Sequence, residues 1–171
     1  MNGQTRVYQQ PPMAYEGMLA STAAINPTEI IPGARASGIV KAGLWAWAAA
    51  SPAGAATDKV LEQFVANTSA SSVKPIGLVY RESIAALPAD QEYSTQYNDG
   101  QPVPVAKGAS FWVKTATAAT VGQKAFAVIA DGATKTGAAG AAITGAVETD
   151  WEVKALQASG AVGDLILISK V

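Results

Sequence analysis

The sequence predicts a mainly β protein, a β-sandwich or barrel, and three observations support that prediction. Short apolar runs alternate along most of the chain, as strands with one buried face require. Glycines precede several of these runs, where they suit the positive-φ positions of turns. Hydrophobic residues make up 49% of the 171 residues, which is enough for a sizeable core. The length fits one compact domain, or a domain with a short arm.

Strands are expected wherever a turn glycine is followed by an alternating apolar run. Four segments have this pattern: residues 41–47, 107–113, 121–128 and 162–168. Three further strands are expected at residues 76–81, 92–97 and 143–156. Their β-branched and aromatic residues suit a pleated, half-buried surface. The Ala/Gly-rich tract at residues 131–142 is expected to form a long hairpin loop.

Residues 57–65 depart from the β pattern. Their apolar side chains would share one helical face: Val60, Leu61, Phe64 and Val65. Thr57 is suited to the N-cap position, and Asp58 to the positive end of a helix. We therefore expect one short helix, inserted between strands within residues 51–72.

Residues 1–36 are expected to form an extended N-terminal arm, ahead of a single β-sandwich domain at residues 37–171. Pro11-Pro12 and the pair Pro32-Gly33 prevent a continuous helix. The arm is either a poorly ordered terminus or a segment that becomes ordered across a neighbouring subunit. In the second case, the side chains expected to contact the neighbour are Tyr8, Tyr15, Met18, Leu19, Ile30 and Ile31.

The composition argues against catalysis and against a metal or cofactor site. The chain contains no His and no Cys, the residues that supply most nucleophiles, proton shuttles and transition-metal ligands. No phosphate-binding or dinucleotide-binding glycine motif is present. The absence of Cys also excludes a disulfide framework and is compatible with assembly in a reducing cytoplasm. We therefore expect a protein that works by binding and not by turnover.

The distribution of charged and apolar residues indicates which classes of partner the protein can bind. The 12 basic residues are scattered and the net charge is −1, which argues against a nucleic-acid partner. The longest apolar candidate, residues 43–56, is short and interrupted, so no membrane partner is expected. Residues 1–13 are polar, unlike a secretion signal. Charged residues make up only 15% of the chain, and such a surface favours assembly with other subunits.

Two sets of side chains leave alternatives open. Glu148, Asp150 and Glu152 alternate along an expected strand, so they would share one face. They would either bind Ca²⁺, serve as a glycosidase pair, or form a solvated face that discourages edge pairing, which we favour. The four tryptophans are Trp45, Trp47, Trp112 and Trp151. Core packing is the favoured interpretation, and one or two of them anchoring a subunit contact is the alternative.

Several short segments also follow one another in a familiar order. They are AYEGMLA at residues 14–20, PIGLV at 75–79, VPVAKG at 103–108, FWV at 111–113, VG at 121–122, ITGAVET at 143–149 and VGDLIL at 162–167. In these segments the chain resembles the head cement, or capsid decoration, proteins of tailed bacteriophages. The resemblance extends from about residue 14 to the end. The insertion at residues 51–72 departs from the shorter members.

The resemblance implies a β-sandwich of jelly-roll type and a role in the virion. Such a protein would bind the outer surface of the major capsid shell at capsomer junctions and stabilise the head. It would often do so as a homodimer, with a trimer as a further option, and its N-terminal arm would reach a neighbour. The alternatives are a trimeric tail, spike or fibre component, and a carbohydrate-binding or metal-dependent hydrolase β-domain.

Overall fold

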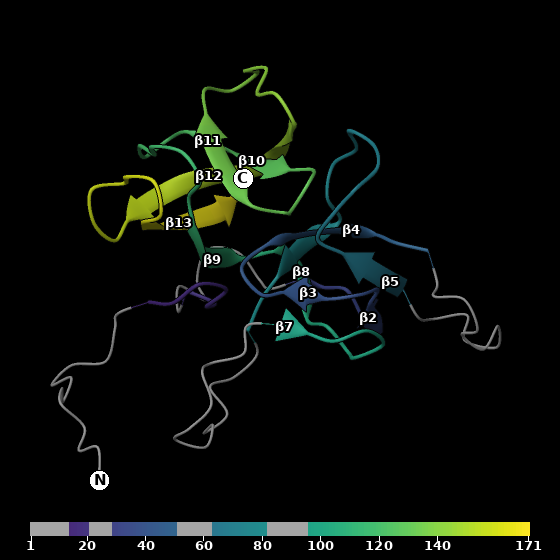
Figure 1. The fold of residues 1–171 in the computed structure, drawn as a ribbon. Helices are drawn as coiled ribbons and strands as arrows, with labels where there is room; N and C mark the ends of the chain where they lie inside the picture. The colour runs from purple at the N-terminus through teal and green to yellow at the C-terminus, as the bar shows by residue number, and fades with distance from the viewer. Residues whose placement is uncertain (1–13, 21–28, 51–62, 82–95) are drawn as a thin grey trace, which may run out of the picture.

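The computed structural model describes residues 14–20, 29–50, 63–81 and 96–171, and these residues form a mainly β fold (Figure 1). A six-stranded sheet has the order β1-β8-β6-β4-β5-β2. Its strands are β1 (Glu29–Ile30), β2 (Ala34–Ala36), β4 (Trp45–Ala48), β5 (Gln63–Ala66), β6 (Gly77–Val79) and β8 (Val105–Gly108). A two-stranded sheet pairs β3 (Val40–Lys41) with β7 (Gln96–Tyr97).

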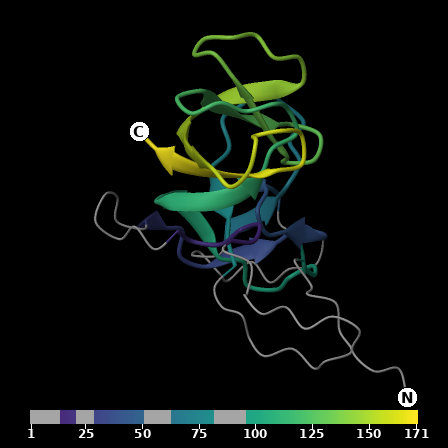
Figure 2. The ribbon, with the colours of Figure 1, turned by 90° about the vertical axis from the view of Figure 1, so that its left-hand side faces the viewer.

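The C-terminal half supplies a five-stranded antiparallel sheet with the order β11-β10-β12-β13-β9. Its strands are β9 (Ser110–Lys114), β10 (Lys124–Val128), β11 (Thr134–Gly137), β12 (Ala146–Leu156) and β13 (Leu165–Lys170). Figure 2 shows this sheet stacked on the N-terminal strands. The two curled sheets make a jelly-roll-like sandwich, as the sequence predicts.

The space between the two sheets is filled by a cluster that we call the sandwich core. It contains Trp45 and Trp47 from β4, Phe111 from β9, and Trp151 from β12, all at most 4% exposed. The rings of Trp45 and Trp151 meet edge to face, with centroids 5.6 Å apart, and Phe111 lies 5.9 Å from Trp151. Aromatic pairs in this geometry add to the stability that burial alone provides.

A second cluster covers the opposite face of the central strands. Side chains alternate along β4, so Ala46 points away from the sandwich core and joins Val79, Val105 and Val65 in this cluster. All three residues of β6 are buried. Because both faces of these strands are covered, their sequences are continuously apolar and do not alternate in polarity.

Three of the four expected turn glycines occupy the conformation that the sequence predicts. Gly43, Gly122 and Gly163 have φ values of +83°, +90° and +89° and precede β4, β10 and β13. The fourth glycine, Gly108, is expected at a turn before a strand, but it is the last residue of β8. The positive φ falls instead on Ala109, at +138°, where the chain passes directly from β8 into β9.

Two local predictions are corrected. The described residues contain no helix, and Gln63–Val65, the end of the expected helix, lie in β5. Pairing with β4 and β2 on either side buries Val65 completely and overrides the helical period. Residues 57–62 lie outside the described residues. The expected loop at 131–142 contains β11, which pairs with β10 and buries Thr134 and Thr136.

The remaining expected strands are confirmed as β4, β6, β8 to β10, β12 and β13. Of the strand expected at residues 92–97, Gln96–Tyr97 form β7, and residues 92–95 lie outside the described part. The residues assigned to the arm at 29–36 contain β1 and β2, which are strands of the six-stranded sheet. Ala34 and Ala36 are small enough to be buried in the second cluster.

Candidate interaction surface

Residues 14–20 lie along the outer edge of β9. The Gly17 amide donates to the carbonyl of Trp112 (2.8 Å), the Trp112 amide donates to Met18 (3.0 Å), and the Ala20 amide donates to Ser110 (2.9 Å). On the other side of this segment, the Gly17 carbonyl accepts a hydrogen bond from the Arg81 amide (2.9 Å). Residues 14–20 therefore cover a sheet edge that would otherwise expose unpaired backbone groups.

The side chain of Glu16 lies beneath this segment. A Cβ on Gly43 would overlap it, so the glycine leaves the space that Glu16 occupies. The Glu16 carboxylate lies 3.7 Å from the Lys114 ammonium, and 23% of its side chain is exposed. Burial raises the pKa of Glu16 above its ordinary value of 4.5, and the charges of Lys114, Arg81 and Lys41 act in the opposite direction.

From this direction of the Glu16 pKa we expect the docking of residues 14–20 to depend on pH. Because the folded-state pKa is raised, the contribution of Glu16 to stability is complete below about pH 4.5 and is lost as the pH rises through the raised pKa. Replacing Glu16 with Gln should remove this dependence and raise the hydrogen-exchange protection of Gly17 and Ala20 at neutral pH. Protection factors measured across the acidic range test this, and an unchanged pH profile in the variant would contradict it.

The expected contact residues occupy different environments. Leu19 is 39% exposed and Ile30 is 49% exposed. Leu19 lies opposite Phe111 on β9 and Ile30 lies opposite Ala106 on β8, so both flank the corner at Ala109 where these strands meet. We call Leu19 and Ile30 the corner patch.

The other expected contact residues do not contribute in the same way. Met18 and Tyr15 are half-buried, and the Arg81 guanidinium lies 5.1 Å from the centroid of the Tyr15 ring. Ile31 is only 6% exposed, because its side chain packs in the second cluster of its own chain. Its place in the expected contact set is therefore corrected to a core position. Tyr8 lies outside the described residues.

The tryptophans are mainly core residues. Trp45, Trp47 and Trp151 are buried, and Trp112 is half-buried on β9. The Trp45 indole donates to the hydroxyl of Thr134 (3.0 Å), and the Trp47 indole donates to the Val73 carbonyl (2.8 Å). Core packing, the favoured interpretation, is thus the observed one for three of them. Three indoles in the core are not available to stack on a sugar ring at the surface.

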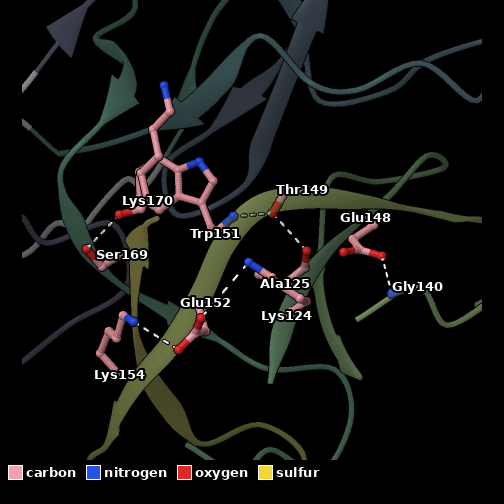
Figure 3. Close-up of polar contacts among 10 residues, drawn as sticks. All are labelled: Lys124, Ala125, Gly140, Glu148, Thr149, Trp151, Glu152, Lys154, Ser169 and Lys170. Carbon is pink, nitrogen blue, oxygen red and sulfur yellow. Dashed lines mark hydrogen bonds and ion pairs between the residues drawn. The ribbon is translucent and has the colours of Figure 1, made fainter. Parts of the chain in front are cut away.

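The carboxylates on β12 are held apart by separate partners. Glu148 accepts from the Gly140 amide (2.7 Å), and Glu152 contacts Lys154 (2.9 Å) and Lys124 (4.0 Å), as Figure 3 shows. Asp150 pairs with Lys74 (2.7 Å). Thr149, Trp151 and Val153 are buried between them, which confirms the predicted alternation. Each carboxylate is engaged by a different group, as in a solvated strand face.

Metal clusters and membrane-spanning helices are both absent from the described residues. In that part of the chain no group of three or more acidic residues converges on a point where an ion would be held. None of its segments forms a helix long and apolar enough to cross a bilayer. The described surface instead offers the covered edge of β9, the corner patch and lysine side chains. The class that the fold defines is a β-sandwich protein.

The comparisons with known proteins identify the family. Residues 3–170 match the family model described as "Structural cement protein (E217 gp24/Pam3 gp6)". The chain therefore belongs to this phage structural cement protein family and is a component of the virion. A chain of the solved structure "The capsid of Myoviridae Phage XM1" has the same fold, with 13% identity and a TM-score of 0.62 over 99% of this chain and 97% of that one. No curated protein matches the sequence.

Proposed function

We propose that this protein cements the phage head by binding the outer surface of the major capsid shell at the junctions between capsomers, without enzymatic activity. The family match over residues 3–170 is the observation that supports this role most directly. The jelly-roll-like sandwich supplies a rigid body, and the absence of His and Cys removes the residues that most reactions use. In this proposal the protein acts by binding through the surface of its β-sandwich.

The proposed mechanism is multivalent clamping. A single contact of this kind typically buries about 1,600 Å² in total, which is a modest interface on its own. When one copy bridges several capsid subunits, release of one contact leaves the others in place at high effective concentration. Many copies on a closed shell would therefore resist the internal pressure of packaged DNA. A homodimer would double the number of contacts for each cement unit, and we propose this state over the trimer expected of a spike.

The corner patch is the proposed contact with a neighbour, together with Tyr15, Met18 and the rest of the N-terminal segment, Tyr8 included. Leu19 and Ile30 are apolar and partly exposed; Leu19 lies opposite Phe111 of β9, and Ile30 of β1 lies opposite Ala106 of β8. Burying a fully exposed side chain of this size contributes about 1.5–3 kcal/mol, so completing the burial of Leu19 and Ile30, which are 39% and 49% exposed, would contribute roughly 1 kcal/mol each. The proposal thus places the binding energy on a few side chains, as is usual for protein interfaces.

The double variant Leu19→Ser/Ile30→Ser should bind phage heads about tenfold more weakly, or worse, because it removes this apolar surface. Its free energy of unfolding should change little, since both side chains are partly exposed. Occupancy on heads that lack the protein, measured by sedimentation and gel densitometry, tests this. The matched control is Val121→Ser/Val162→Ser, at turns where the two valines are 61% and 69% exposed. Equal losses of occupancy in both variants would contradict the assignment.

A further inference from the structure

Two adjoining hollows lie where the loop before β6 meets β12. One has a volume of about 120 Å³ and the other about 420 Å³, and both are lined by Lys74, Thr149 and Asp150. The smaller hollow also reaches Lys107 and Lys170, and the larger one reaches Lys124 and Glu148. We call this continuous depression the lysine groove. Both sheets contribute to it, since Lys107 lies on β8 and Lys170 on β13.

Two tryptophans are among the residues that line the smaller hollow. Trp45 and Trp151 line it and are buried in the sandwich core, where their rings meet edge to face. The 120 Å³ hollow is larger than the space that a single water needs, so it can admit the end of a polar side chain. A rigid apolar lining beside charged side chains suits a group that has an apolar stem and a charged end.

The charge of the groove is positive. Four of the 12 basic residues in the chain line it, against the two lining carboxylates Glu148 and Asp150, and one of the four, Lys124, also lies 4.0 Å from Glu152. This concentration contrasts with the net charge of −1 for the chain. Clustered lysines around a cleft with low-dielectric walls focus the electrostatic field and favour an anionic partner.

The chain's own Asp150 carboxylate is bound by a lysine of the groove. It lies at an irregularity in the β10–β12 pairing, between Glu148 and Glu152, and its oxygen is 2.7 Å from the Lys74 nitrogen. The hydrogen bond from Lys74, together with the charges of Lys74, Lys170 and Lys124, lowers the pKa of Asp150. Both side chains of the Lys74–Asp150 pair are about 60% exposed, so a competing carboxylate can replace Asp150 at little cost.

We propose that the lysine groove is a docking site for an acidic, extended segment of a protein partner, with one carboxylate of that segment seated beside the two tryptophans. This inference rests on the proposed function, which makes a capsid subunit the partner that would supply the segment. Glu148 and Asp150 would repel the closely spaced phosphates of a nucleic acid, whereas a peptide can place its few carboxylates beside the lysines. Val73, which precedes Lys74 in the chain and is 54% exposed, is an apolar side chain that such a segment could also contact.

The test is a titration of the isotope-labelled full-length protein with a synthetic peptide of alternating glutamate and serine, followed by NMR and calorimetry. A lysine–serine peptide and a DNA oligonucleotide serve as comparisons. We expect shifts of the amides around Lys107, Asp150 and Trp151 with the acidic peptide alone. Binding should be lost at about 1 M NaCl, where the Debye length is about 3 Å.

Two variants locate the site. Lys74→Glu/Lys107→Glu should weaken binding of the acidic peptide about tenfold or more, because it reverses two exposed charges in the groove. The control, Lys41→Glu/Lys135→Glu, changes the net charge by the same amount on β3 and β11, outside the groove lining and away from the partners of its lysines. Lys107→Gln, which removes one charge without reversing it, gives the same test should the double variant fail to fold.

The outcomes separate this inference from the proposed function. Weakened peptide binding and weakened head occupancy in Lys74→Glu/Lys107→Glu, with the control unaffected, would support the inference. Absent peptide shifts, equal effects in both variants, or tighter binding of the oligonucleotide would overturn it while head binding by the native protein still stood. Failure of the native protein to bind heads would instead refute the proposed function, whatever the peptide does.

Discussion

Replacing Trp151 with Ala should lower the free energy of unfolding by about 3–5 kcal/mol, because a large buried ring is removed and the cavity cannot fully collapse. Trp151 is 4% exposed and contacts both Trp45 and Phe111 in the sandwich core. Small domains have a total stability of about 5–15 kcal/mol, so this variant would be close to unfolding at physiological temperature. Urea denaturation followed by circular dichroism measures the change.

The matched control for this prediction is Trp112→Ala. Trp112 is half-buried on β9, so its truncation removes less buried surface and should cost about 1–2 kcal/mol. Similar losses for the two variants would mean that the sandwich core is not the main source of stability. A loss below about 1 kcal/mol for Trp151→Ala would contradict the described packing.

Replacing Gly160 with Ala should cost about 2–4 kcal/mol, because backbone strain and steric overlap act together. Gly160 has a φ of +75°, and its carbonyl accepts a hydrogen bond from the Ala119 amide (2.7 Å). A Cβ at this position would overlap the Ala119 carbonyl oxygen and lie 3.1 Å from Leu156 Cδ1. The two loops would have to separate to admit the methyl group.

Gly163→Ala measures the backbone strain alone, so the difference between the two variants gives the steric part of the cost. Gly163 has a similar φ of +89°, but a Cβ there would meet no atom within 4 Å. We therefore expect only the strain of a left-handed alanine, about 1–2 kcal/mol. Thermal and urea unfolding of both variants provide the comparison. Equal costs would show that residues 119 and 160 do not approach each other as closely as described.

The strands that the sequence predicted correctly are those whose signals are local. The turn glycines Gly43, Gly122 and Gly163 stand directly before apolar runs, and the alternation along β12 places Thr149, Trp151 and Val153 inward. Each of these features depends on neighbouring residues alone. The family resemblance then added the jelly-roll character, which local patterns do not specify.

The features that the sequence did not predict depend on distant residues. β5 forms because Gln63–Val65 lie beside β2, about 30 positions earlier, and this pairing overrides a helical spacing of Phe64 and Val65. β11 depends on β10 to bury two threonines within an Ala/Gly-rich tract. Ile30 and Ile31 are neighbours of the same residue type, so the sequence does not distinguish them. In the structure Ile31 is buried and Ile30 is exposed.

The lysine groove was missed for the same reason. Its four lysines, at residues 74, 107, 124 and 170, are each separated from the next by 17 to 46 positions along the chain, so the sequence contains no run of basic residues there. Only the stacking of the two sheets brings them to one depression. The docking of residues 14–20 on β9 likewise joins segments about 90 positions apart.

Cosedimentation of the purified full-length protein with phage heads that lack it tests the central claim most directly. The account predicts saturable binding to the heads, with a fixed number of copies per shell, and greater resistance of the loaded heads to heat or osmotic shock. Protein that stays in the supernatant beside intact heads, or that binds without any gain in head stability, would contradict it.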